Sequence, residues 1–215
     1  MNASVTNGGP LAVLRRFAQT GAKEERCDLC NARLAPGHRH LLEMENRIIH
    51  CSCEGCAMRL QGVMGGRFKM IPRDARALPG LEMSDGQWEG LALPINLAFF
   101  FHSSPAGKMI ALHPSPAGAM ESLMPPETWE ALVAANPVLD DIERDVEALL
   151  VNRVDECREY FIAPIDKCYE LAGLIRTHWR GLHGGDIVWG KIDDFFARLK
   201  LQTAPVRENG APVHA

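Results

Sequence analysis

The sequence predicts an α+β protein, with a small N-terminal zinc-finger module joined to a larger domain. Two Cys-x-x-Cys pairs, at 27–30 and 53–56, lie in one short segment and indicate four thiolates around one metal ion. Further along the chain, two apolar runs flank a turn and are followed by patterns that are mostly helical. These observations favour a small antiparallel sheet packed with about four helices.

The composition is that of a globular protein. The chain has 215 residues, of which 47% are hydrophobic and 23% charged, enough apolar material for a core. No apolar run reaches the roughly 20 residues that a membrane-spanning helix needs. We divide the chain into a flexible N-terminus that can form a short helix over 10–20, a zinc-binding module, an α+β domain and a polar tail, at residues 1–24, 25–66, 67–201 and 202–215.

Between the two cysteine pairs, the pattern predicts a β-hairpin. Residues 38–44 and 48–51 form its strands, and residues 45–47 form the turn, with Asn46 tolerating a left-handed backbone. Residues 54–61 then predict a short helix that ends at Gly62 or at the following glycines. The order of knuckle, hairpin and helix resembles the treble-clef class of zinc fingers.

Cys27, Cys30, Cys53 and Cys56 are the predicted metal ligands, and zinc is the predicted ion. The second pair falls in the first turn of the predicted helix, where free amide groups favour thiolates. Four protein ligands leave no open position for substrate or water, so we do not expect a metalloenzyme at this site. The ion should supply most of the module's folding free energy, on the order of 10 kcal/mol.

Other interpretations of the same residues stay open. A rubredoxin-like iron centre also uses two Cys-x-x-Cys knuckles, and would make the chain an electron carrier. Disulfides would require an oxidising compartment, and no signal peptide precedes the module. Four nearby residues could replace a predicted ligand: His38, His40, His50 and Cys51.

Charge is distributed unevenly along the chain. Residues 1–70 carry a net charge of +4, and residues 71–215 carry −8. The arginines of the basic part form no run, and the acidic part would repel a polyanion, which argues against nucleic acid as partner. We expect a cytoplasmic protein whose partner is another protein.

The larger domain begins with strand-like patterns. Residues 67–71 alternate as a strand, and residues 91–102 form an apolar strand that returns through a Ser/Pro/Gly turn into 108–113. Residues 113–118 contain two prolines and predict a loop. Residues 160–164 predict a further strand.

Helical spacing dominates the remaining segments. Predicted helices begin at Pro126 and at Asn136-Pro137; the second continues to Leu150 with an outward acidic face. Two more helices run over 166–179 and 186–199, capped by Asp166 and Asp186. On the first of these, Cys168 falls in the apolar stripe and is expected in the core. His178 and His183 follow, and together with Cys168 are the candidates for an enzymatic site in this domain.

Six segments resemble an uncharacterised bacterial family encoded beside the structural genes of some nickel-iron hydrogenases. These segments span residues 93–100, 113–118, 145–150, 164–171, 179–185 and 195–196. The resemblance implies an accessory role in assembly or maturation of that enzyme, with a hydrogenase subunit or maturation factor as partner. It implies no catalytic residues.

Overall fold

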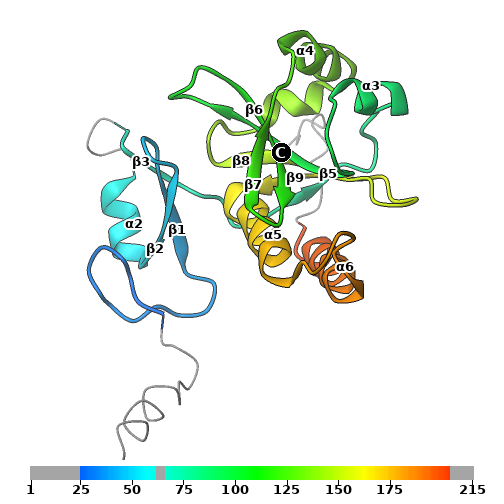
Figure 1. The fold of residues 1–215 in the computed structure, drawn as a ribbon. Coiled ribbons are helices and arrows are strands. Elements are labelled where there is room, and N and C mark those ends of the chain that lie inside the picture. Colours follow the sequence, from blue (N-terminus) through cyan, green and yellow to red (C-terminus); the bar gives the residue numbers. More distant parts are fainter. Residues whose placement is uncertain (1–24, 62–65, 204–215) are drawn as a thin grey trace, which may run out of the picture.

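The fold contains two antiparallel sheets, seen in a computed structural model that describes residues 25–61 and 66–203 (Figure 1). The predicted α+β class is confirmed: a cysteine-rich knuckle, hairpin and short helix precede a larger sheet with its helices. The helix predicted over 10–20 and nearly all of the tail lie outside the described residues. The helix predicted over 54–61 ends one residue early, at Leu60, with Gln61 as its C-cap. Among the described helices, none is long and apolar enough to cross a bilayer.

The smaller, N-terminal sheet contains the predicted hairpin. Its strands are β1 (Arg39–Glu43), β2 (Ile48–Ser52) and β3 (Phe68–Met70), in the order β2-β1-β3. Helix α2 (Glu54–Leu60) covers one face, where Leu41, Ala57 and Phe68 form a small apolar cluster. In the turn, the left-handed residue is Arg47, with φ of 54°, rather than Asn46.

The larger, central sheet has six strands in the order β4-β9-β8-β5-β6-β7. They are β4 (Arg76–Ala77), β5 (Leu97–Ser103), β6 (Lys108–Ser115), β7 (Gly118–Ser122), β8 (Glu147–Asn152) and β9 (Glu159–Pro164). Both faces of β5 are buried, with Phe99 in one apolar cluster and Phe100 in the other. Because successive side chains of a strand point to opposite faces, β5 reads as a continuous apolar run.

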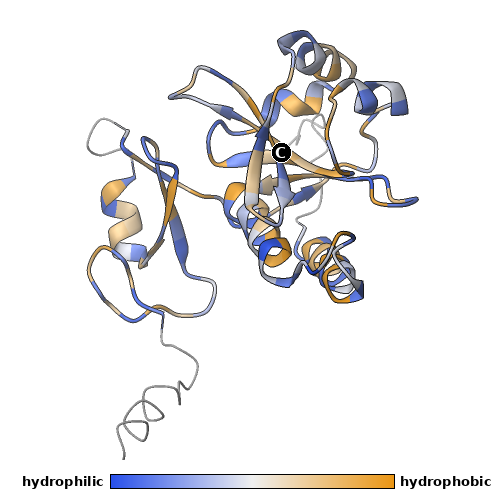
Figure 2. Ribbon diagram, viewed as in Figure 1, coloured by the Kyte–Doolittle hydropathy of each residue, from blue (hydrophilic) through white to orange (hydrophobic). Residues whose placement is uncertain are grey.

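Helices cover both faces of the central sheet. On the Phe99 face lie α5 (Ile165–His178) and α6 (Asp186–Leu201), whose turns mix hydrophobic and hydrophilic residues (Figure 2). On the Phe100 face lie α3 (Asp85–Gly90), α4 (Pro126–Ala135) and the 3-10 helix η1 (Pro137–Asp141). The core is therefore two apolar layers separated by one sheet.

The helix predicted from Asn136-Pro137 to Leu150 is wrong. Only η1 is helical, and β8 follows it in the middle of the sheet. Every residue of β8 is buried, and a strand buried on both faces can imitate the apolar spacing of a helix. The predicted outward acidic face is partly wrong. Asp140, Asp141 and Glu143 are exposed. Asp145 and Glu147 are buried, and Asp145 accepts the N–H and hydroxyl of Ser104 at 2.6 and 2.7 Å.

The segment before β5 also differs from the prediction. Residues 91–96 are not part of the strand, and α3 precedes them. Ser84 caps α3: its hydroxyl accepts the N–H of Gln87, and the Gln87 side chain accepts the N–H of Ser84. This capping box is a sequence signal for a helix start, and it could have revealed α3.

The loop predicted at 113–118 is mostly strand. β6 continues through Pro114 to Ser115 and turns directly into β7. Pairing of β6 with β5 ends at Leu112, so the missing N–H of Pro114 removes no bond from that ladder. The two prolines therefore did not exclude a strand in this segment.

The predicted caps of the last two helices are wrong. Pro164 and Gly185 occupy the cap positions of α5 and α6, and neither has a side-chain cap. Asp166 and Asp186 lie within the first turns, where a negative charge is still favourable. One oxygen of the Asp166 carboxylate accepts the N–H of Lys167, and the other contacts a distant part of the chain.

The two sheets share apolar contacts. Leu42 of β1 and Ile71, just after β3, belong to the same buried cluster as Phe99. At the margin, the Lys69 ammonium donates to the carbonyl of Arg144 at 2.6 Å and lies 3.2 Å from the Glu143 carboxylate. The hairpin therefore presents one face to α2 and the other to the central sheet and its helices.

Asn136 joins the chain before α3 to the end of α4. Its side chain is buried, accepts the N–H of Glu82 at 2.7 Å, and donates to the carbonyls of Glu82 and Leu132. We expect Asn136→Ala to destabilise the protein by about 1–3 kcal/mol, because it leaves buried backbone groups unpaired. Urea unfolding of the metal-saturated protein measures this. Glu130→Ala, at an exposed position of α4, is the control, and an equal effect of both changes would contradict the assigned role.

Candidate metal centre

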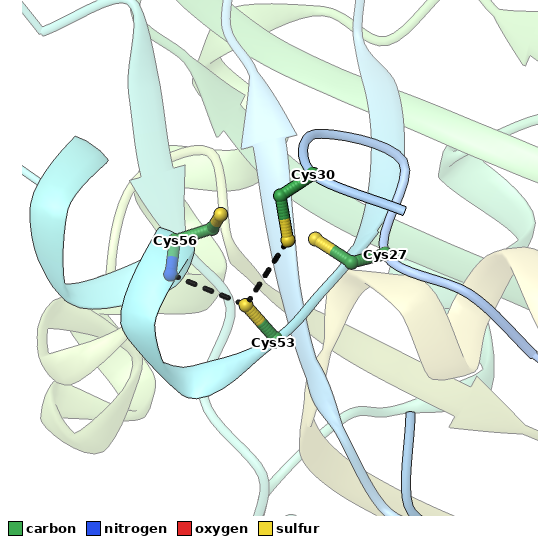
Figure 3. Close-up of side chains that lie close together, drawn as sticks. All are labelled: Cys27, Cys30, Cys53 and Cys56. Atoms are coloured by element: carbon green, nitrogen blue, oxygen red, sulfur yellow. Dashed lines mark hydrogen bonds between the residues drawn. The ribbon is translucent and has the colours of Figure 1, made fainter. Parts of the chain in front are cut away.

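The four predicted cysteine ligands meet at one point (Figure 3). Cys27 and Cys30 lie in the loop before β1. Cys53 is the N-cap of α2, and Cys56 lies in the first turn of that helix. The close-up shows the four sulfur atoms directed toward a common centre from these two segments. We call them the cysteine cluster.

Local backbone bonds shape the first knuckle. The N–H of Asn31 donates to the carbonyl of Cys27, and the N–H of Cys27 donates to the carbonyl of Ala32, both at 2.8 Å. Asn31 adopts φ of 63°, a left-handed conformation that asparagine tolerates well. An isolated bridge between Arg26 and Arg33 closes the loop. The turn thus holds both sulfurs on one side.

The sulfur separations suit a tetrahedral ion. All four sulfur atoms lie within 4.8 Å of one another, and those of Cys30 and Cys53 are 3.7 Å apart. Four sulfurs at about 2.3 Å from a tetrahedral ion would be about 3.8 Å apart. A disulfide needs a separation of about 2.05 Å, and all seven cysteines are free thiols. The cluster could therefore bind a metal ion.

Two of the four thiols, those of Cys27 and Cys56, differ strongly in pKa before metal binding. Burial raises the pKa of Cys27, but hydrogen bonds from the backbone of Cys53, Leu29 and Cys30 outweigh it and lower the value to about 6. The contact with Cys30, followed by burial, raises the pKa of Cys56 to about 12. The Cys27 thiolate is thus present near neutral pH, and its charge opposes ionisation of Cys56. A bound cation would remove this opposition.

The chain matches the model of a known family. The model of a family of unknown function, DUF5947, matches residues 26–203. The chain belongs to this family. The match begins one residue before Cys27 and includes both sheets. No curated protein and no solved structure matches this DUF5947 chain.

The residues considered as replacement ligands separate into two groups. His38, His40 and Cys51 form a second set of donor atoms within 4.8 Å of one another, outside the cysteine cluster. His50 belongs to neither set: it lies beside Phe68, and its Nε2 is 3.5 Å from the Glu43 carboxylate. In the DUF5947 chain, Cys51 and His50 point to opposite faces of β2, as neighbours on a strand must.

The candidates for an enzymatic site in the larger domain do not converge. Cys168 is buried in the apolar core, as predicted, and burial raises the pKa of its thiol well above the usual range. His178 lies ten residues further along α5, about 15 Å along the helix axis. Its Nδ1 is bound to the carbonyl of Leu174, and His183 lies on an exposed loop. This DUF5947 chain therefore offers no site built from these three residues.

Metal binding to the cysteine cluster should release protons. At pH 7 we expect at least one proton per ion, because Cys56 is protonated and must ionise to bind. Cys27, with a pKa of about 6, contributes little above neutral pH, but its protonation weakens binding as the pH falls below 6. Calorimetry in two buffers of different ionisation enthalpy measures the release. Identical heats in both buffers would contradict this expectation.

The sequence analysis did not identify two carboxylates that lie beside His40 and Cys51. Asp166 of α5 contacts His40, and Asp28, inside the first knuckle, accepts the N–H of Cys51 at 2.7 Å. No spacing rule joins residues that are 126 positions apart. Asp28 lies within a cysteine pair, so its position between two ligands was a signal for a supporting role in the DUF5947 chain.

Proposed function

We propose that the chain is a zinc-binding accessory protein that assists assembly or maturation of a nickel-iron hydrogenase through protein–protein contacts. The observation that carries the zinc-binding part is the convergence of four thiols whose sulfur atoms lie within 4.8 Å of one another. A soft, closed set of four sulfurs is the ligand set of structural zinc. Such an ion holds a surface in shape and does no chemistry of its own.

The surface around the cysteine cluster supports a role in contacts. Leu29 lies between two of the ligands in sequence, and Met58 follows Cys56 by two residues on α2. Both side chains are exposed, with Met58 at 63%. Leucine and methionine beside a rigid, metal-fixed turn can insert into an apolar pocket of a partner.

The hydrogenase part rests on resemblance. The segments at 93–100, 113–118 and 164–171, among others, are similar to the family encoded beside nickel-iron hydrogenase genes. They fall on β5, on the β6–β7 turn and at the start of α5. The resemblance therefore concerns the central sheet, and the cysteine cluster adds the metal-dependent part of the proposal.

Elemental analysis and visible absorption of protein purified without added metal test the ion. We expect zinc and a colourless protein. A red protein that contains iron would replace this proposal with the rubredoxin-like electron carrier, because iron bound by four thiolates absorbs visible light through charge transfer. Zinc would exclude electron transfer at this site, since zinc has no redox chemistry.

Capture of purified hydrogenase subunits by the immobilised, metal-loaded chain tests the partner. We expect binding that Met58→Asp weakens by about tenfold, equivalent to 1.4 kcal/mol, with no loss of metal. Leu182→Asp, at another exposed leucine in the loop before α6, is the matched control and should bind normally. Absence of binding by the metal-loaded wild type would reject the hydrogenase as partner while leaving the zinc assignment intact.

A further inference from the structure

A second group of metal-binding side chains lies on the opposite face of the hairpin from α2. His40 and Cys51 are directly opposite each other in the β1–β2 register, and His38 precedes His40 by two residues. Residues two apart on a strand share a face, so His38, His40 and Leu42 project together toward the central sheet and its helices. We call His38, His40 and Cys51 the histidine cluster.

The two imidazoles meet through the same ring nitrogen. Nε2 of His38 and Nε2 of His40 are 3.1 Å apart, and the Cys51 sulfur lies within 4.8 Å of one ring nitrogen of each histidine. The two rings are nearly perpendicular, at 85°. Two ring nitrogens at this distance need either a proton or a cation between them.

The other nitrogen of each ring already has an oxygen acceptor. Nδ1 of His40 is 2.6 Å from the Asp166 carboxylate, in the first turn of α5. Nδ1 of His38 is 3.3 Å from the carbonyl of Ala35 and 3.4 Å from the Glu25 carboxylate. These acceptors hold a proton on each Nδ1, which leaves a lone pair on each Nε2. Both lone pairs therefore point into the same small space.

We propose that His38, His40 and Cys51 form a second metal site, which binds a divalent transition-metal ion such as zinc or cobalt with an open fourth position. Nitrogens at about 2.05 Å from a tetrahedral ion would be about 3.3 Å apart, close to the separation of the two Nε2 atoms. One thiolate and two imidazoles suit ions of borderline softness. A carboxylate bound to the far nitrogen of a ligating histidine is the usual outer support of such sites.

This site differs from the cysteine cluster in chemistry and in accessibility. Three protein ligands leave one position for water or for an exchangeable group, whereas four thiolates leave none. The His38 side chain is 9% exposed and that of His40 is 29% exposed, so the site lies at the edge of the junction with α5. An ion could enter there without unfolding of the chain.

Cys51, His40 and Asp166 could also be taken for a nucleophilic triad. In such a triad the free nitrogen of the histidine faces the thiol alone, as its general base. Here Nε2 of His40 faces Nε2 of His38 at 3.1 Å, and the second imidazole has no role in that chemistry. The pair of converging nitrogens therefore favours a metal ion over a nucleophile.

Metal titration of the full chain tests the proposal. The chelator-treated protein is titrated with Co²⁺, and the bound metal is measured by elemental analysis and by absorption. We expect two ions per chain for wild type and one for Cys51→Ala or His40→Ala, with the bands of the four-thiolate site unchanged. His50→Ala, on the same hairpin but on its other face, should still bind two. A single ion in wild type, or two in Cys51→Ala, would overturn the proposal.

Two further measurements separate metal binding from a purely structural role. Asp166→Asn should weaken Co²⁺ binding at the second site alone, by about 10–100-fold. Glu170→Gln, on the same helix and more exposed, should not change it. Thiocyanate should alter the cobalt absorption of wild type but not of Cys51→Ala, because only the second site has an open position. An unaltered wild-type spectrum would refute the open position. Rapid alkylation of Cys51 in a protein that binds one ion would indicate the nucleophile instead.

Discussion

Cys30→Ser should bind one metal ion fewer than wild type and should lose the ordered structure of the N-terminal sheet. Serine replaces the thiolate ligand with a hydroxyl, which coordinates metal poorly. The tetrahedral site would then have three sulfur ligands in place of four. Structural zinc contributes on the order of 10 kcal/mol to folding in small metal-binding modules. The buried cluster of Leu41, Ala57 and Phe68 is too small to replace that contribution.

Hydrogen exchange and elemental analysis together measure this effect. Amides of β1, β2 and α2 should exchange much faster in Cys30→Ser and in Cys56→Ser, while β8 and β9 keep their protection. Cys157→Ser is the matched control, because Cys157 lies in the β8–β9 loop outside both clusters. Full metal content in both cluster variants would show that the ligands were wrongly assigned.

Phe100→Ala should destabilise the whole protein by about 3–5 kcal/mol, the usual cost of removing a buried aromatic ring. The Phe100 side chain is fully buried and stacks on Trp129 of α4 at 6.0 Å between ring centroids. A cavity there would separate α4 from the sheet. The metal content should not change, because Phe100 lies on the face away from the N-terminal sheet.

Chemical unfolding of the metal-saturated protein measures this change. Met120→Ala, on the exposed edge strand β7, is the control and should change stability by no more than about 0.5 kcal/mol. A small effect of Phe100→Ala would mean that α4 and the sheet do not unfold together. Loss of metal in that variant would mean that the two sheets depend on each other through the Phe100 face.

The convergence of the four cysteines could be predicted from the sequence because they come as two short-range pairs. The spacing of the two cysteines within a turn fixes the direction of both sulfurs. In the hairpin between the pairs, side chains alternate between the two faces, which is the usual signal for strands. The predicted order of knuckle, hairpin and helix needed no knowledge of distant contacts. The same holds for Cys168, whose place in the apolar stripe of α5 was visible in its neighbours.

The central sheet was harder to predict because burial on both faces removes the alternation that distinguishes a strand. Residues 147–152 therefore had the apolar spacing of a helix, although they form β8 in the middle of the sheet. Asp166 was predicted to cap a helix, yet its carboxylate binds His40 across the chain. Such a contact depends on how the two sheets meet, and no local pattern contains that information.

The shared burial of Leu42 and Ile71 with Phe99 has a consequence for any attempt to divide the chain. Cutting the chain between the two sheets would expose apolar surface on each fragment. Leu42 would be exposed on the smaller fragment, and the α5 side of the central sheet on the larger one. Fragments with exposed apolar patches of this kind tend to aggregate. The N-terminal hairpin should therefore fold stably only together with the layer of the central sheet against which it packs.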